Sequence, residues 1–226
     1  MKSEIVSRFT VANFMKTFPN SLPVRALAVL AAVFAFAQMA VAQTSYTWNP
    51  GGADENWSTP GNWSPNTGAG GPTALDSVIC GDTGTSADSN TVNNVVDAGF
   101  AGTVANLTYN SASATSSSAP VFNVTQIPSG QTLTVAGNLL VGGLNEGAGA
   151  YITYAYLTGG GALEVTGTNV FVENYGSAAG ANATAYLDLS GLSDFIFNNT
   201  NAELSIADTT SGLTRAGGTL NLASVR

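Results

Sequence analysis

The chain has 226 residues, with 14 acidic side chains against 6 lysines and arginines, no histidine and one cysteine, and its net charge is −8. This acidic balance repels phosphate groups, which excludes nucleic acid and anionic lipid as favoured partners. A single cysteine excludes a disulfide framework, and the lack of histidine removes the commonest general base and transition-metal ligand.

Residues 1–42 are predicted to be a secretory signal peptide. Basic residues precede the uninterrupted apolar run Ala26–Ala37, and the segment ends on Ala40-Val41-Ala42. This order is typical of a signal, cleaved here between Ala42 and Gln43. The alternative is a retained membrane anchor, but the run is short for about 30 Å of hydrocarbon. We therefore expect a protein located outside the cell, with no membrane span after processing.

Residues 43–80 are predicted to form a tryptophan-rich N-terminal cap. The first turn of a stacked repeat protein exposes an apolar end that needs covering, and Trp48, Trp57 and Trp63 lie just before the first expected turn. The alternative is that these three residues form a platform for carbohydrate, because aromatic faces are amphipathic contact surfaces. Cys80 ends the apolar run Val78-Ile79-Cys80 and is predicted to be a small core residue.

Residues 81–226 are predicted to be β-solenoid rungs. Helical periodicity is missing, and short runs instead carry two apolar residues at i and i+2 before a polar or glycine turn. A strand with two inward side chains needs neighbours stacked on it, which a solenoid provides. The apolar pairs include Leu133/Val135, Leu139/Val141, Leu163/Val165, Val170/Val172, Leu187/Leu189, Phe195/Phe197, Leu204/Ile206 and Leu220/Leu222.

A loose repeat supports this fold class. Gly130–Asn138 is similar to Gly161–Asn169, and Gly218–Leu222 looks like the opening of a third copy. The spacing is irregular, so the repeat has no strict period. The sequence therefore predicts an all-β, parallel β-helix (β-solenoid), with a β-sandwich or jelly roll as the alternative. We expect the rungs to be incomplete at the C-terminus, so that an open strand edge favours end-to-end self-association.

The chain from about Tyr46 to its end resembles a known family, and the most specific motifs lie in the first part. The motifs are Tyr46-Thr47-Trp48-Asn49, Asn56-Trp57, Gly61-Asn62-Trp63-Ser64 and Pro72-Thr73-Ala74-Leu75-Asp76-Ser77-Val78. They resemble the opening of bacterial autotransporter-associated β-strand repeat proteins, and Asn94–Thr108 is similar to the first rung of that family. The resemblance implies a β-solenoid displayed on, or secreted from, a bacterial surface. Family members are usually much longer than this chain.

Catalysis is not expected from the residues available. Paired carboxylates are the remaining option for glycoside hydrolysis, and the candidate pairs are Asp54 with Glu55, Asp188 with Asp194, and Glu164 with Glu173. Acids scattered in this way are expected to be solvated charges, so we predict no catalytic residue, no cofactor and no metal.

The predicted function is that of an exported structural or adhesive surface protein, with surface polysaccharide or other cell-surface components as partners. The alternatives are a carbohydrate-binding module that uses the three tryptophans, or a polysaccharide-active enzyme on a β-helix.

Overall fold

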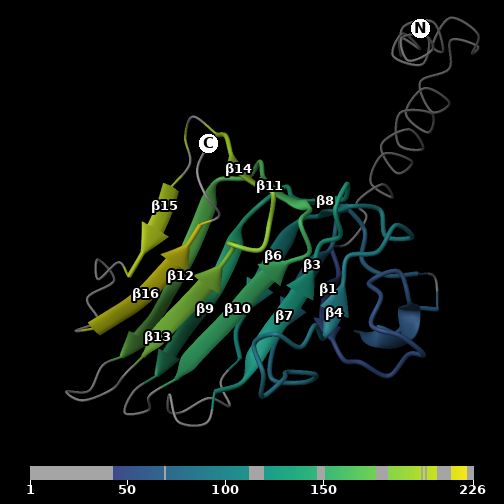
Figure 1. Ribbon diagram of the computed structural model, residues 1–226, viewed down its shortest axis with the longest axis horizontal. Coiled ribbons are helices and arrows are strands. Elements are labelled where there is room, and N and C mark those ends of the chain that lie inside the picture. The colour runs from purple at the N-terminus through teal and green to yellow at the C-terminus, as the bar shows by residue number, and fades with distance from the viewer. Residues whose placement is uncertain are drawn as a thin grey trace, which may run out of the picture. The chain divides into compact units, whose positions relative to one another are not determined.

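The computed structural model describes residues 43–68, 70–111, 120–146, 151–176, 183–199, 201, 203–207 and 215–222, which form a β-solenoid of about four turns (Figure 1). The all-β solenoid prediction is confirmed, and the sandwich and jelly-roll alternatives are not formed. The predicted signal peptide, including Ala42 at the cleavage site, lies outside the described residues.

Along the chain, successive described strands belong in turn to three sheets, named A, B and C here. Sheet A holds β1 (Ser45–Trp48), β3 (Ser77–Cys80), β6 (Asn106–Tyr109), β9 (Leu139–Glu146), β12 (Asn169–Gly176) and β15 (Glu203–Ile206). Sheet B holds β4 (Asn94–Val95), β7 (Phe122–Gln126), β10 (Ile152–Thr158), β13 (Thr184–Asp188) and β16 (Arg215–Asn221). Sheet C holds β5 (Thr103–Val104), β8 (Thr132–Val135), β11 (Ala162–Val165) and β14 (Asp194–Phe197).

Two antiparallel pairings depart from the otherwise parallel stacking of these strands. After the short 3₁₀ helix Pro60–Asn62, β2 (Trp63–Ser64) pairs antiparallel with β1 at the edge of sheet A. β16 pairs antiparallel with part of β12, which joins sheets A and B.

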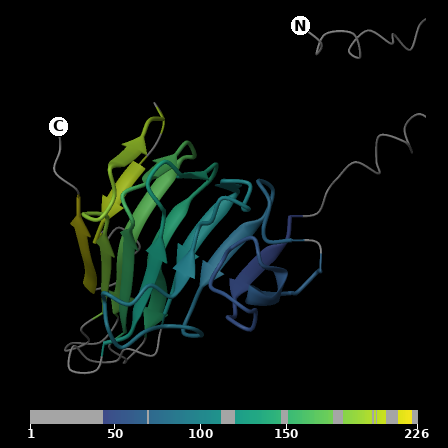
Figure 2. The same ribbon diagram turned by 45° about the vertical axis from the view of Figure 1, so that its right-hand side comes forward.

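The loose repeat of the sequence corresponds to one turn of the solenoid. In sheet A, Val78, Leu107, Leu139, Val170 and Leu204 are successive register partners, so one turn takes 29 to 34 residues. Figure 2 shows the resulting strands lying side by side across the successive turns. Variation in the loops between the strands explains why no strict period is visible in the sequence.

The apolar pairs fill the interior as predicted, except at one end. Leu133 and Val135 on β8 pair with Leu163 and Val165 on β11, and all four are buried. Complete burial of such a side chain contributes about 1.5–3 kcal/mol. The same registers are kept along the solenoid, so each turn covers the apolar residues of the turn before it.

The corner between sheets C and A explains part of the similarity between Gly130–Asn138 and Gly161–Asn169. Gly137 and Gly167 stack so closely that a side chain on Gly167 would meet the Gly137 backbone. Next to them, the Asn106 Oδ1 atom accepts a hydrogen bond from the Asn138 amide at 2.9 Å, and Asn169 Nδ2 donates to Asn138 Oδ1 at 3.2 Å. Both segments end on a glycine and an asparagine, adjacent in Gly137-Asn138 and one residue apart in Gly167-Thr168-Asn169, and these residues build a stacked polar corner.

One part of the repeat prediction is wrong. Gly218–Leu222 lies largely on β16 and pairs with β13 in sheet B, with Leu220 beside Leu187. The segments it was compared with contain β8 and β11, which belong to sheet C. The error arises because strands of all three sheets share the same short apolar pattern, so the pattern alone does not identify the sheet.

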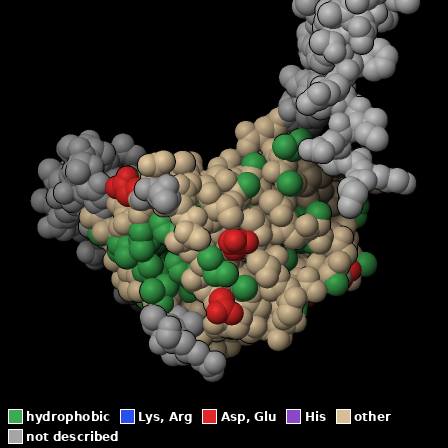
Figure 3. Space-filling model, turned by 90° about the horizontal axis from the view of Figure 1, so that it is seen from above, with side chains coloured by type: hydrophobic (Ala, Val, Ile, Leu, Met, Phe, Trp, Pro, Cys, Tyr) green, Lys and Arg blue, Asp and Glu red, His purple; other side chains and the backbone are tan. Residues whose placement is uncertain are grey.

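Apolar side chains are exposed at the C-terminal end of the described solenoid. Leu204 and Ile206 continue the registers of Val170 and Val172, yet 44% and 42% of their surfaces are exposed. Figure 3 shows hydrophobic side chains gathered toward the end at which Figure 1 places β15 and β16. The expected end-to-end self-association stays a prediction.

Candidate functional site

The three tryptophans of the predicted cap lie together at the N-terminal edge of sheet A. Trp48 and Trp63 are register partners on β1 and β2, and their ring centroids are 5.1 Å apart. Trp57 packs edge to face against Trp63 at 5.4 Å and against Phe100 at 5.2 Å. Such pairs are worth about 0.5–1.5 kcal/mol beyond the area they bury. Trp48, Trp57, Trp63 and Phe100 are called the interior cluster below.

Burial corrects the prediction that these tryptophans contact carbohydrate. Trp57 Nε1 donates to Asn94 Oδ1 at 2.9 Å, and Trp63 Nε1 donates to the Trp57 carbonyl at 2.8 Å. The exposed fraction of Trp48, Trp57 and Trp63 is only 0–2%. A sugar needs an open aromatic face, and these rings face protein. Their position at the edge of sheet A agrees with a capping role, which stays a prediction.

A second aromatic group lies on the outer face of sheet B. Phe122 on β7, Tyr154 on β10 and Tyr186 on β13 are register partners, so they form a row across three turns. Their neighbouring centroids are 4.9 and 6.0 Å apart. Tyr156 lies on the same face, 5.4 Å from Phe122 and 5.6 Å from Tyr186.

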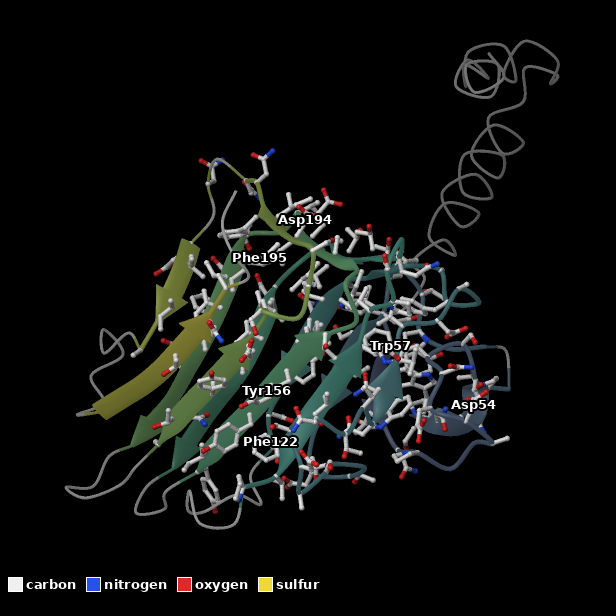
Figure 4. The ribbon with its side chains drawn as sticks, in the orientation of Figure 1. Asp54, Trp57, Phe122, Tyr156, Asp194 and Phe195 are labelled. Atoms are coloured by element: carbon white, nitrogen blue, oxygen red, sulfur yellow. The ribbon has the colours of Figure 1, made fainter. Side chains whose placement is uncertain are left out.

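These four side chains are called the surface row below. All four are partly exposed, and Figure 4 shows Phe122 and Tyr156 close together on this sheet. Aromatic rings therefore occur in two environments: those of the interior cluster are buried, and those of the surface row are in contact with solvent.

A pocket of about 360 Å³ adjoins the surface row. Tyr156 and its register partners Val124 and Asp188 lie along the pocket, which therefore crosses three turns. Its volume is within the range of small-ligand sites, and polar groups make up most of its lining. The lining residues are Ser89, Asn90, Val92, Val124, Gln126, Tyr156, Leu157, Thr158, Asp188, Ser190 and Gly191.

The loop between β3 and β4 contributes Ser89, Asn90 and Val92 to this lining, and hydrogen bonds fix that loop to β7. Ser86 and Phe122 exchange two backbone hydrogen bonds, of 2.9 and 2.7 Å. Asn93 Nδ2 donates to the Phe122 carbonyl at 2.8 Å. The loop is therefore anchored to the same strand that carries one end of the surface row.

Asp188 is the charged group of the pocket. Its carboxylate accepts hydrogen bonds from the Ser190 amide at 2.8 Å, from Asn221 Nδ2 at 2.9 Å and from the Tyr186 hydroxyl at 3.4 Å. Partial burial by itself raises the pKa of Asp188, but the hydrogen bonds outweigh it, so the pKa lies below 3.8. Asp188 is therefore an anion at neutral pH and can accept further hydrogen bonds from a ligand.

Tyr156 remains a neutral phenol at neutral pH. Burial has the largest effect, followed by the nearby Tyr186, Asp188 and Tyr154, and together they raise the pKa of Tyr156 to about 12. The protonated hydroxyl can both donate and accept a hydrogen bond. The pocket thus combines an apolar ring, a hydroxyl and a carboxylate.

The sequence analysis missed the surface row. Phe122, Tyr154 and Tyr186 are separated by 32 residues each, which is the length of the turns from β7 to β10 and from β10 to β13. This spacing becomes a signal only when the turn length is known, because aromatic residues so far apart have no local pattern. A search for aromatic residues at a constant 32-residue interval would have found the row.

The candidate carboxylate pairs do not gather in one place. Asp188 is on sheet B and Asp194 on sheet C, while Glu164 is on sheet C and Glu173 on sheet A. Residues 54–55 are exposed in the segment between β1 and β2. Within the part of the chain that the structure describes, no group of three His, Cys, Asp or Glu residues could hold a metal ion.

Cys80 is a core residue, as predicted. It is completely buried, and burial raises the pKa of its thiol to about 12. A cysteine reacts through its thiolate, so Cys80 is not a nucleophile at neutral pH.

Comparison with known proteins gives no relative from which a function could be inferred. No family model matches the chain, and no curated protein or solved structure is significantly similar to it. In the described ranges, no helix is long and apolar enough to cross a membrane.

Proposed function

We propose that this protein is exported and acts outside the cell as a structural or adhesive surface protein without catalytic activity. The observation that carries the proposal is the surface row with its pocket, a contact surface assembled from three successive turns. A solenoid repeats one supersecondary unit, and its curvature and length create extended binding surfaces. The signal-like segment 1–42 supports export, and the resemblance to autotransporter-associated repeats supports display at a bacterial surface.

The chemistry of the pocket favours binding over catalysis. Most glycosidases use two carboxyl groups, and Asp188 is the only carboxylate among the described lining residues. Because its pKa is lowered, Asp188 holds no proton at neutral pH and is unsuited to act as a general acid. The pocket therefore offers contacts to a partner such as a surface polysaccharide rather than the machinery of a hydrolase.

Export can be tested by expressing the full chain with a C-terminal epitope tag in a bacterial host. We expect the tag on intact cells or in the medium, on a protein whose intact mass begins at Gln43. The matched control lacks residues 1–42 and should remain inside the cell. An uncleaved full chain found only in the cytoplasm would contradict the proposal.

A further inference from the structure

We infer that the surface row and the adjoining pocket bind a neutral polysaccharide chain laid across β7, β10 and β13. The inference rests on the proposed function in one respect only, namely that the protein binds this ligand outside the cell. It assigns a ligand class to a site formed by aromatic rings, an anion and polar side chains of sheet B.

The arrangement of the rings points to an elongated ligand. Phe122, Tyr154 and Tyr186 come from three consecutive turns, with centroids 4.9 and 6.0 Å apart, and all are partly exposed. Aromatic faces carry negative charge density, and the C–H groups on the face of a pyranose ring carry a partial positive charge. A ligand that contacts every ring of the row must extend along the solenoid, which suits a chain of linked sugars.

The polar groups beside the rings match the hydroxyl groups of a sugar. The Asp188 carboxylate can accept hydrogen bonds from hydroxyls, and charge-assisted bonds of this kind are among the stronger ones. Gln126 and Asn90 add side-chain amides from other parts of the lining, and Tyr156 adds a hydroxyl. Apolar ring faces with donors and acceptors at their margin are what a pyranose requires, because its faces are apolar and its edge is polar.

Charge decides which polysaccharides are favoured. Asp188 is anionic, and the described lining of the pocket contains no lysine or arginine to balance it. Residues 43–226 carry two arginines against thirteen acidic residues, a net charge of −11. Acidic polysaccharides and nucleic acids are repelled by such a surface. The site therefore favours an uncharged chain.

The backbone of the site argues against a peptide added as a strand. β10 is already paired on both sides, with β7 and with β13. Peptide recognition by strand addition needs a free sheet edge, and the surface row lies in the middle of a sheet. Side chains alone are available to a ligand here.

The test is calorimetric titration of the purified protein with soluble linear β-glucan, xylan and mannan, and with polygalacturonate as the acidic counterpart. We expect at least one neutral polymer to bind and polygalacturonate not to bind. Tyr156→Ala and Tyr186→Ala should each weaken the binding about tenfold or more. The matched control is Phe171→Ala, which removes a partly exposed aromatic ring from β12 in sheet A and should leave the affinity unchanged.

Two conservative variants keep the test informative if an alanine variant fails to fold. Asp188→Asn preserves the shape of the pocket and should increase binding of polygalacturonate, because it removes the repelling charge. Tyr156→Phe keeps the ring and should weaken binding less than Tyr156→Ala. Circular dichroism checks that each variant is folded.

Several results would overturn the inference: no binding of any neutral polymer, equal loss of affinity in the Phe171→Ala control, or tighter binding of polygalacturonate than of neutral chains by the unaltered protein. Self-association abolished by Tyr186→Ala, without glycan binding, would assign the row to a second copy of the chain instead. Failure of export with intact glycan binding would reject the proposed function but not this inference, and the reverse result would reject only the inference.

Discussion

The interior cluster and the surface row are built from the same kind of side chain but occupy opposite environments. In the interior cluster, the indole rings of Trp48, Trp57 and Trp63 are 0–2% exposed and pack edge to face. In the surface row, Phe122 and the three tyrosines keep part of their surface in solvent. Aromatic residues are thus buried at one end of the solenoid and open to solvent on one of its faces.

The difference follows from register and, for two of the three tryptophans, from hydrogen bonding, since the buried Trp48 Nε1 atom has no hydrogen-bond partner among the described residues. Trp57 and Trp63 each place their indole N–H against an oxygen of the protein, so the whole side chain can be buried without losing a hydrogen bond. Tyr154, Tyr156 and Tyr186 alternate with buried residues along β10 and β13, and alternation forces them outward. Position in the strand therefore places these three tyrosines on the outer face of sheet B.

The largest effect is expected from truncation inside the interior cluster. Trp63→Ala removes the ring that packs against Trp48 and Trp57, and should lower the free energy of unfolding by about 3–5 kcal/mol. Tyr154→Ala in the surface row should cost only about 1 kcal/mol, because its ring is already partly solvated. Urea denaturation of both variants, followed by circular dichroism, measures the two losses under the same conditions.

Equal losses in the two variants would break the comparison. If Trp63→Ala were nearly neutral, the interior cluster would not stabilise the solenoid, and its capping role would be rejected. If Tyr154→Ala were as costly as Trp63→Ala, the surface row would be part of the structural core and a poor candidate for a binding site.

A smaller effect is expected where the chain enters β1, the strand that carries Trp48. Asp76 is almost completely buried, and it accepts hydrogen bonds from the Thr44 amide at 3.1 Å, from the Thr73 amide at 2.9 Å and from the Thr73 hydroxyl at 2.6 Å. Burial raises the pKa of Asp76, but these hydrogen bonds outweigh it and lower the pKa below 3.8. Asp76→Asn should therefore cost about 1–2 kcal/mol at neutral pH.

The pH dependence checks the cause of that loss. Because the folded-state pKa of Asp76 is depressed, its contribution to stability is present above the unfolded-state value of about 3.9 and is lost as the pH falls through the folded-state value. Stability of the unaltered protein should fall more steeply than that of Asp76→Asn over this acidic range. If the stability of the two proteins fell in parallel with pH, the negative charge of Asp76 would not stabilise the segment before β1.

The sequence predicts the solenoid but not the order of its sheets. Alternation in segments such as Leu133–Val135 identifies strands with two inward residues, and that pattern is local. The sheet to which a strand belongs depends on loop lengths between strands, as the misplacement of Gly218–Leu222 shows. No short-range pattern encodes such a distance, so the fold class was predictable and the full topology was not.

The candidate site was less predictable than the fold for the same reason. The sequence marks Trp48, Trp57 and Trp63 as unusual, but an indole suits both a core and a binding surface, and only burial distinguishes them. No short sequence pattern marks the surface row, because Phe122, Tyr154 and Tyr186 are 32 residues apart and become neighbours only when the chain completes a turn. Residues that a solenoid brings together in register can be recognised only after the register is known.

The smallest effect concerns the ionisation of Tyr156, which tests how deeply the surface row lies in the protein. The pKa of Tyr156 is raised to about 12, first by burial and then by Tyr186, Asp188 and Tyr154. An alkaline titration of the protein labelled with ¹³C-tyrosine, with Tyr156→Phe to assign the signal, should find this value. Asp188→Asn should lower the pKa of Tyr156 because it removes a neighbouring negative charge, yet leave it above the usual value of about 10 because burial remains.

A Tyr156 that titrates near 10 in the folded protein would mean a fully solvated ring, and the contrast with the interior cluster would then be greater than the structure shows. A Tyr156 unaffected by Asp188→Asn would instead remove Asp188 from contact with the row, and with it the charge that favours neutral chains.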